Sequence, residues 1–106
     1  IQPSVTKCGG ISGMKHIFTL AQAYSVRVVP HCFYWGPGYH ATAHLAASRP
    51  EVTLLETAFI DFIIQPHKLF EASQSSLDLS EKPGLGFEAD WDALSNYIVS
   101  RHSISS

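Results

Sequence analysis

Polar side chains stand at the ends of three apolar segments in this sequence, and one of them is suited to proton transfer. His31 follows the run "VVP", Glu56 follows "TLL", and Ser4 to Lys7 stand at the end of the first segment, before a glycine-rich turn. An imidazole serves as general acid or base because it titrates near neutral pH. Because neighbouring parallel strands deliver their carboxyl ends to one rim, we expect these side chains to converge there.

Each of these residues could also have a purely structural role that involves no catalysis. His31, taken alone after a buried strand, is more often a hydrogen-bonded structural histidine than a catalyst. Glu56 could form a salt bridge with Lys7 from a neighbouring strand end. Lys7 could contact a substrate carboxylate or stand behind the residues that do, and Ser4 could be a polar filler. The residues alone leave these alternatives open.

The elements that must position these side chains alternate along the chain. Apolar and β-branched residues predict strands at 1–8, 26–30 and 52–58. Helices are predicted between them, over 14–24 and 39–48, the first with an apolar face made of Met14, Ile17, Phe18, Ala21 and Tyr24. This order implies parallel strands joined by right-handed crossovers. The recurrence of the strands every ~25 residues is typical of a barrel or solenoid.

Three parallel strands cannot bury both faces of a sheet, so the sequence predicts only part of a barrel. Residues 59–70 are ambiguous between helix and strand, 72–80 are Ser-rich and irregular, and 81–86 form a tight turn. Asp90 is expected to cap a last helix. Its apolar face, which we expect to dock on the rest of the protein, comprises Trp91, Leu94, Tyr97 and Ile98.

Composition narrows the function classes. The 106 residues make one small domain, and the net charge of −2 without a basic stripe argues against a nucleic-acid partner. No apolar run approaches the length of a membrane span. Charged residues make up only 15% of the chain, which suggests that other protein covers part of its surface. Cys8 and Cys32 suggest isolated thiols and a cytoplasmic setting rather than a disulfide framework.

Two further groups of residues have ordinary explanations beside sharper ones. His40 and His44 are spaced i, i+4, which lets two imidazoles share a metal on one helical face. No neighbouring Glu or third ligand supports a metal site, so we expect surface or packing roles on an outer helix. The aromatic run Phe33, Tyr34, Trp35 could line a substrate pocket or pack beneath another domain.

Four stretches of the sequence resemble one family, in the family's order and spacing. "QPSVTKCGGISG", "VVPHCFYWGPG", "LLETAF" and "KPGLGFEADWDAL" are similar to the C-terminal part of the enolase superfamily. The resemblance is to the mandelate racemase/muconate lactonizing enzyme branch, which includes acid-sugar dehydratases. It implies an α/β fold in which 1–76 are the last three βα units of a modified TIM barrel. Residues 77–106 would then form a C-terminal segment that returns toward a capping domain.

The resemblance also implies a chemistry. Enzymes of this family abstract the proton α to a carboxylate and stabilise an enediolate on Mg²⁺. His31 matches the family's histidine that acts as general base or acid. Glu56 matches the glutamate that hydrogen-bonds a substrate carboxylate, for which it must be protonated or strongly paired. Ser4 departs from the pattern: it stands where racemase-like members have an aspartate that bonds the histidine and lactonizing members have a lysine. Without that aspartate nothing obvious raises the basicity of His31, so we expect dehydration, with His31 as acid, to be favoured over racemization.

The family's Mg²⁺ ligands and its opposing lysine would lie upstream of this chain. We therefore expect a C-terminal fragment that, alone, neither binds the metal nor turns over substrate. The implied partners are a small hydroxy-acid or acid-sugar substrate, the missing N-terminal part of the barrel and its cap, and further copies in a homo-oligomer. The alternatives are a racemase or epimerase of the same family, and a catalytically silent fragment or small α/β binding module.

Overall fold

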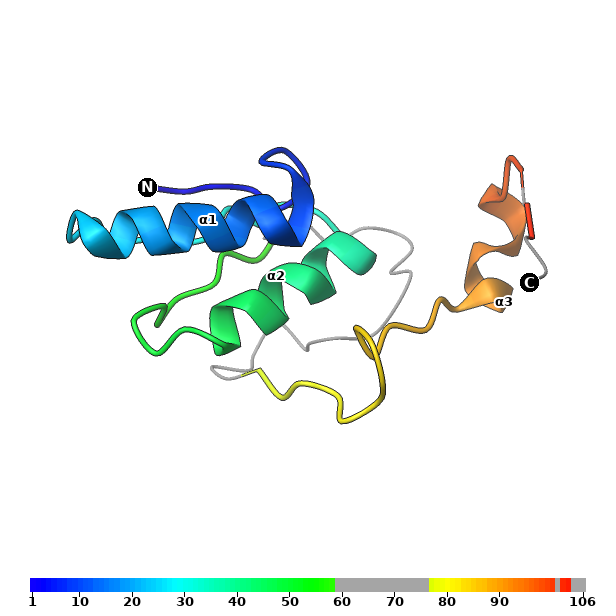
Figure 1. Cartoon of the computed structure of the whole chain (residues 1–106). Coiled ribbons are helices and arrows are strands. Elements are labelled where there is room, and N and C mark those ends of the chain that lie inside the picture. The colour runs from blue at the N-terminus through cyan, green and yellow to red at the C-terminus, as the bar shows by residue number, and fades with distance from the viewer. Residues whose placement is uncertain (59–76, 101, 104–106) are drawn as a thin grey trace.

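The computed structural model describes residues 1–58, 77–100 and 102–103. The sequence-based assignments for 59–70 and for most of 72–80 lie outside these residues. The described helices, in chain order, are α1 (Gly10–Ala23), α2 (Pro37–Ala47), the single turn α3 (Trp91–Leu94) and the 3-10 turn η1 (Ser95–Tyr97). Helices α1 and α2 pack together beside the extended segments, and α3 stands apart from them (Figure 1). None of the described helices is long and apolar enough to cross a bilayer.

The predicted strands are wrong as regular strands, because the described residues contain no assigned β-strand. The first two segments nevertheless run side by side in parallel. The amino group of Ile1 donates to the Arg27 carbonyl at 2.7 Å, and the Val29 N–H donates to the Ile1 carbonyl at 3.0 Å. The His31 N–H then donates to the Pro3 carbonyl at 3.0 Å. These bonds follow the alternating pattern of a parallel ladder.

Two prolines explain why this ladder stays incomplete. The bond between Val29 and Pro3 that would come next in the pattern needs an N–H on residue 3, and proline has none. Pro30 likewise cannot donate toward the third segment, which lies on its other side. Proline inside a strand interrupts pairing in this way. The segments are therefore extended and parallel without forming a continuous sheet.

Helix α1 covers these segments with one face, as its apolar spacing predicts. Met14, Phe18 and Ala21 are buried and pack in one cluster with Val5, Val28 and Leu45. Full burial of a side chain such as Met14 or Phe18 stabilises the fold by about 1.5–3 kcal/mol each. The prediction is wrong for Tyr24, which is 74% exposed. That residue lies at the C-cap, beyond the last helical turn that packs on the cluster.

Residue Ser25 ends α1 through its backbone conformation. Its φ of 55° places it in the left-handed region. The Ser25 N–H donates to the Gln22 carbonyl at 3.1 Å, and the Val26 N–H donates to the Ala21 carbonyl at 2.8 Å. This pair of bonds is the Schellman arrangement, which satisfies the last carbonyls of a helix and usually has glycine at the left-handed position. Ser25 therefore ends the helix at some cost in conformational energy.

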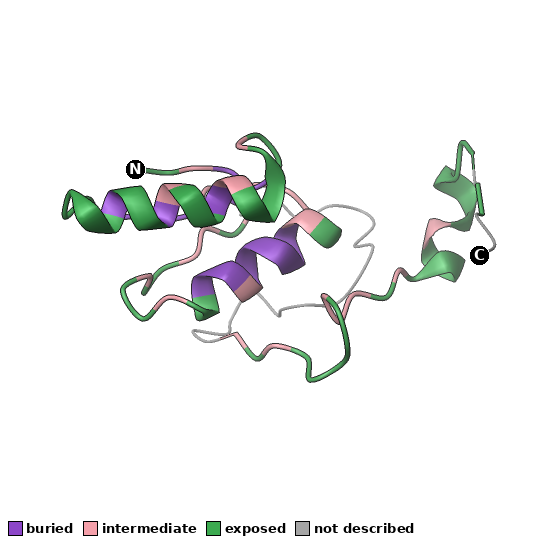
Figure 2. Ribbon diagram, viewed as in Figure 1, coloured by how far each residue is buried: buried purple, intermediate pink, exposed green. Residues whose placement is uncertain are grey.

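Helix α2 is buried along most of its length, whereas α1 shows buried and exposed residues in alternation (Figure 2). It begins at Pro37, slightly earlier than predicted, because proline suits the first helical position, where its missing N–H costs nothing. The segment around Leu85, in the C-terminal part of the chain, packs against α2. The Leu85 carbonyl lies 3.2 Å from His40 Nδ1 and 3.2 Å from His44 Nε2. The His40 ring also meets the edge of Phe87 with centroids 5.0 Å apart.

The two histidines thus share a carbonyl oxygen, which agrees with the packing role expected for them. The last helix follows the prediction at its start, since Asp90 Oδ1 accepts from the Ala93 N–H at 2.9 Å. It is only one turn long, and among the described elements it packs on η1 alone. Its expected docking face is exposed, with Trp91 at 51% and Tyr97 at 60%. The predicted docking is therefore not found in the described part of the chain.

We predict that Ser25→Gly raises the free energy of unfolding by about 0.5–1 kcal/mol, because glycine adopts the left-handed conformation without the Cβ penalty. Thermal or urea unfolding followed by circular dichroism measures the change. Gln22→Gly is the matched control in the last turn of the same helix, where glycine should lower stability by about 0.5 kcal/mol. Destabilisation by Ser25→Gly would contradict this account of the helix end.

We predict that docking of the Leu85 segment on α2 weakens as the pH falls. Burial lowers the pKa of His40 below its ordinary value of 6.5, and the nearby His44 lowers it further, against the opposing effect of the Leu85 carbonyl. The docked state therefore favours neutral His40, so its stability is complete above pH 6.5 and is lost as the pH falls through the lowered pKa. Amide-exchange protection factors of residues 85–87, which correct for the intrinsic pH dependence of exchange, measure this between pH 8 and 5.

His40→Asn is the informative variant, because an asparagine amide can replace the Nδ1 donor but does not titrate. It should remove the pH dependence of the protection factors at 85–87, whereas His16→Asn on the exposed side of α1 should leave it intact. Equal pH dependence in both variants would show that another group is responsible.

Candidate proton-transfer site

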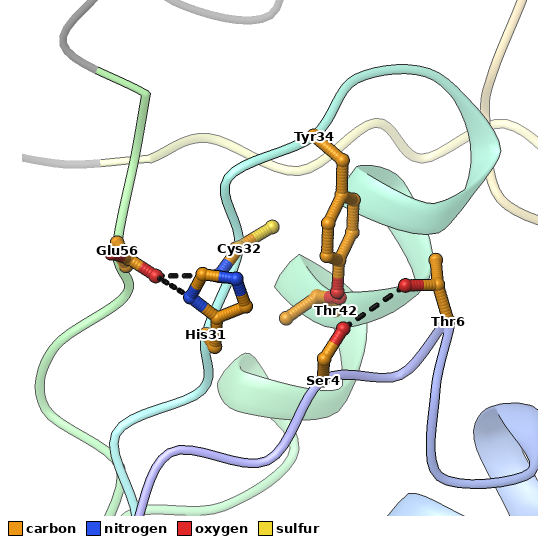
Figure 3. Close-up of polar contacts among 7 residues, drawn as sticks. All are labelled: Ser4, Thr6, His31, Cys32, Tyr34, Thr42 and Glu56. Atoms are coloured by element: carbon orange, nitrogen blue, oxygen red, sulfur yellow. Dashed lines mark hydrogen bonds and ion pairs between the residues drawn. The ribbon is translucent and has the colours of Figure 1, made fainter.

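The parallel register brings Ser4, His31 and Glu56 together from three segments of the chain. Since the Val29 N–H bonds Ile1 and the His31 N–H bonds Pro3, residue 4 falls beside residue 31. The next N–H along the middle segment, that of Cys32, points to the opposite side and donates to Glu56 Oε2 at 2.9 Å. Figure 3 shows His31 with Glu56 on one flank and Ser4 on the other.

His31 and Glu56 form the central contact of the site. His31 Nδ1 lies 2.5 Å from Glu56 Oε2, and the two side chains are 34% and 35% exposed. An ionised carboxylate only accepts hydrogen bonds, so the imidazole carries its proton on Nδ1 toward Glu56. In the neutral ring, Nε2 is then the basic nitrogen, available to exchange a proton with a bound molecule. Glu56 Oε1 has no hydrogen bond to any residue in the described ranges.

This contact gives His31 a partner that the sequence did not indicate, and it excludes one alternative for Glu56. With serine at position 4 nothing in the sequence raised the basicity of His31, whereas in the structure Glu56 from the neighbouring segment pairs with the imidazole. The alternative salt bridge between Glu56 and Lys7 is not formed. Lys7 lies exposed in the turn before α1, and within 1–58 and 77–100 its side chain has no ion pair or hydrogen bond. The expected common rim therefore includes His31, Glu56 and Ser4, while Lys7 is not part of the hydrogen-bonded cluster.

Ser4 is buried, with an exposed fraction of 6%. Its hydroxyl pairs with Thr6 Oγ1 at 3.0 Å, and either oxygen can be the donor. A serine contributes no charge at this position, so the flank of His31 opposite Glu56 is neutral and polar. Among the described residues, the imidazole thus has a carboxylate on one side only.

Sequence reasoning named Tyr34 only as part of an aromatic run and missed its partner Thr42. Tyr34 OH lies 2.9 Å from Thr42 Oγ1, and Thr42 donates to the Gly38 carbonyl at 2.8 Å in α2. The Tyr34 ring meets the His31 ring edge-on, with centroids 6.4 Å apart and planes at 77°. Thr42 could have been found from its position eight residues after Tyr34 and one helical turn after Gly38, but nothing in its type suggested a site.

Cys32 lies in the same group without being a nucleophile. Burial raises the pKa of its thiol from 9.0 to about 11, and the neighbouring Thr42 and Tyr34 hydroxyl groups offset that only in part. The reactive form of cysteine is the thiolate, so Cys32 stays protonated at neutral pH. Cys8 is likewise a free thiol, near the Met14 sulfur at 3.8 Å.

The described residues do not fit a resident metal. Among them, no group of at least three His, Cys, Asp or Glu side chains could hold an ion. One carboxylate oxygen of Glu56 already accepts hydrogen bonds from His31 and the Cys32 N–H. His40 and His44 converge on the Leu85 carbonyl and have no acidic ligand beside them. The described part of the chain therefore offers no complete set of ligands for Mg²⁺.

Comparison with known proteins identifies relatives over almost the whole chain. Residues 1–93 match the family described as enolase C-terminal domain-like. D-Galactarolactone cycloisomerase of Agrobacterium fabrum is 33% identical over 112 aligned residues, covering 92% of this chain and 29% of that protein. D-Gluconate dehydratase of Thermoproteus tenax is 31% identical, with coverage of 92% and 20%. D-Xylonate dehydratase of Haloferax volcanii is 28% identical, with coverage of 93% and 25%. The chain thus spans between 20% and 29% of the length of these relatives.

We predict that His31 and Glu56 stabilise each other measurably. A double-mutant cycle with His31→Ala and Glu56→Ala at pH 7 should give a coupling energy of about 1 kcal/mol, because partial burial strengthens the bond while solvent still screens it. Urea unfolding of the four proteins provides the measurement. The Lys82–Glu88 pair, 60% and 75% exposed, is the matched control and should show coupling near zero. A coupling no larger than the control would mean that the contact is not maintained in solution.

Proposed function

Because this chain belongs to the enolase C-terminal domain-like family, we propose that it carries the histidine side of the active site of an acid-sugar dehydratase. The observation that carries the proposal is the contact between His31 and Glu56 at the shared end of neighbouring segments. Sequence similarity to several dehydratases supports the reaction class, and the geometry supports the residues assigned to it. The activity is proposed for the complete protein, of which these residues form one part.

Dehydration of a hydroxy acid needs two proton transfers. The C–H bond α to the carboxylate breaks as a base takes the proton, the β C–O bond breaks, and the leaving oxygen takes a proton from an acid and departs as water. His31 performs one of these transfers through Nε2, because Glu56 holds the proton on Nδ1. A protonated His31 delivers its Nε2 proton to the leaving hydroxyl, and a neutral one accepts the α proton.

Glu56 has two functions in this proposal. Its Oε2 fixes the tautomer and orientation of His31, and it is itself held by the Cys32 N–H. Its Oε1 is available to accept a hydrogen bond from a substrate hydroxyl or protonated carboxyl group. This differs from the role implied by resemblance alone, in which Glu56 served only the substrate. Ser4 lines the neutral flank of His31, and its hydroxyl can bond an uncharged substrate hydroxyl.

The neutral flank favours dehydration over racemization. Racemization requires a base on each face of the α carbon, and a dyad aspartate beside His31 would belong to the racemase-like pattern. An isomerase of the same family is the second candidate, because one relative is a D-galactarolactone cycloisomerase. Proton transfer by His31 would serve either reaction, so the product analysis described below separates them.

The remaining parts of such an enzyme would come from outside this chain. In this proposal 1–76 supply the last three βα units of the barrel and 77–106 its C-terminal segment. Family resemblance implies that Mg²⁺ stabilises negative charge on the substrate carboxylate, and its ligands would belong to the rest of the barrel. A cytoplasmic location and homo-oligomeric assembly stay predictions from the sequence.

The test uses the complete gene product that contains this chain, assayed with Mg²⁺ on D-gluconate, D-galactonate and D-xylonate. Dehydration gives a keto acid, which is detected as its semicarbazone. His31→Asn should lower kcat/KM by about 10²–10⁴-fold, the usual contribution of a positioned acid or base. His16→Asn, on the exposed side of α1, should have no effect.

Retention of activity by His31→Asn would overturn the role of the imidazole. A product isomeric with the substrate, with no keto acid formed, would replace the dehydratase by the isomerase candidate. No turnover of any acid sugar by the unmutated protein would favour the silent-fragment alternative.

A further inference from the structure

We propose that Tyr34 is a positioning residue that holds the His31 imidazole against Glu56. Three contacts carry the inference: the ring pair with His31, the hydrogen bond to Thr42, and the space left by Gly38. The catalytic meaning of this role rests on the proposed function. The physical role, control of the orientation and tautomer of His31, can be tested without catalysis.

Few contacts limit the movement of the His31 imidazole. About a third of its side chain is exposed, and its hydrogen bond to Glu56 is made by Nδ1 alone. This bond sets which nitrogen faces Glu56, but the tilt of the ring depends on its other neighbours. The Tyr34 ring stands at 77° to the imidazole, with centroids 6.4 Å apart, which is the edge-to-face geometry that stabilises aromatic pairs. Tyr34 therefore occupies space on one side of the imidazole and disfavours rotation away from Glu56.

A hydrogen bond to helix α2 holds Tyr34 in place. Thr42 has one hydroxyl proton, which it donates to the Gly38 carbonyl one turn earlier in α2. The bond between the two hydroxyls must then run from Tyr34 to Thr42, at 2.9 Å. Thr42 is fully buried. The phenol is thus bonded to a rigid helix at a fixed point, although Tyr34 lies in the loop before that helix.

Gly38, in the first turn of α2, lies close beside the Tyr34 ring. A Cβ at this residue would come within 3.2 Å of Tyr34 Cε2 and 2.8 Å of Thr6 Cγ2. The backbone of α2 therefore approaches the ring closely enough that only glycine leaves both neighbours in place. A ring fixed by a hydrogen bond at one end and by backbone along its side is well suited to set the position of the imidazole.

A merely structural role for Tyr34 makes a different prediction. Its ring also packs on the hydrophobic cluster around Phe18, so substitution should lower stability in either case. Only a positioning role should change the imidazole of His31 in a protein that remains folded. The ¹⁵N chemical shifts of the ring nitrogens report which nitrogen carries the proton, and so provide a readout that stability does not move.

The experiment measures these shifts in the 106-residue chain above pH 8. The unmutated chain should hold the proton mainly on Nδ1. Tyr34→Phe, which loses the bond to Thr42, and Tyr34→Leu, which also loses the ring, should lower the ratio of the Nδ1–H to the Nε2–H tautomer by roughly three- to tenfold, with the larger effect in Tyr34→Leu. Thr42→Ser keeps the hydroxyl and should preserve the ratio, whereas Thr42→Val should lower it.

Tyr24→Phe, at an exposed tyrosine, is the matched control and should change nothing. An unchanged ratio in folded Tyr34→Phe and Tyr34→Leu would overturn the proposal. If Tyr34→Leu fails to fold, Tyr34→Phe decides, since it removes one oxygen atom and keeps the ring. The result is independent of turnover: a changed tautomer ratio in a protein without dehydratase activity would support the positioning role and count against the proposed function alone.

Discussion

Successive N–H groups along an extended chain point to opposite sides, and the geometry of this site depends on that constraint. The His31 N–H bonds the Pro3 carbonyl on one side, while the Cys32 N–H bonds the Glu56 carboxylate on the other. These two bonds place the segment that carries His31 between the segments of Ser4 and Glu56. The imidazole reaches Glu56 because the adjacent backbone N–H already holds that carboxylate. One oxygen, Glu56 Oε2, thus serves both the backbone and the side chain of neighbouring residues.

Much of this arrangement could be predicted from the sequence, and the failures have physical causes. Alternating apolar segments and helical spacing gave the order of elements and the buried face of α1, because burial and period are local properties. The regularity of the strands was overestimated, because Pro3 and Pro30 each remove a donor from the ladder. That His31 and Glu56 share one end of the segments followed from strand direction. Their direct contact depends on register, which no single segment specifies. Lys7 lies exposed in the turn before α1, and strand direction alone could not place its side chain.

The position occupied by Ser4 gives the site an asymmetric electrostatic character. A carboxylate stands on one flank of the imidazole and paired hydroxyls on the other. Deep burial keeps the Cys32 thiol protonated, so it adds no competing anion. The only charged group in contact with His31 among the described residues is therefore Glu56. Such a site can move one proton at Nε2 without a second ionisable neighbour to share it, and that property links the local geometry to the choice between reactions in this family.

The contact between α2 and the C-terminal segment uses a main-chain oxygen. His40 and His44 both approach the Leu85 carbonyl. Because every residue carries a carbonyl group, these two hydrogen bonds require both imidazoles but do not depend on which side chain residue 85 carries. Substitutions in this segment would therefore alter the packing around Phe87 before they altered the hydrogen bonds to α2.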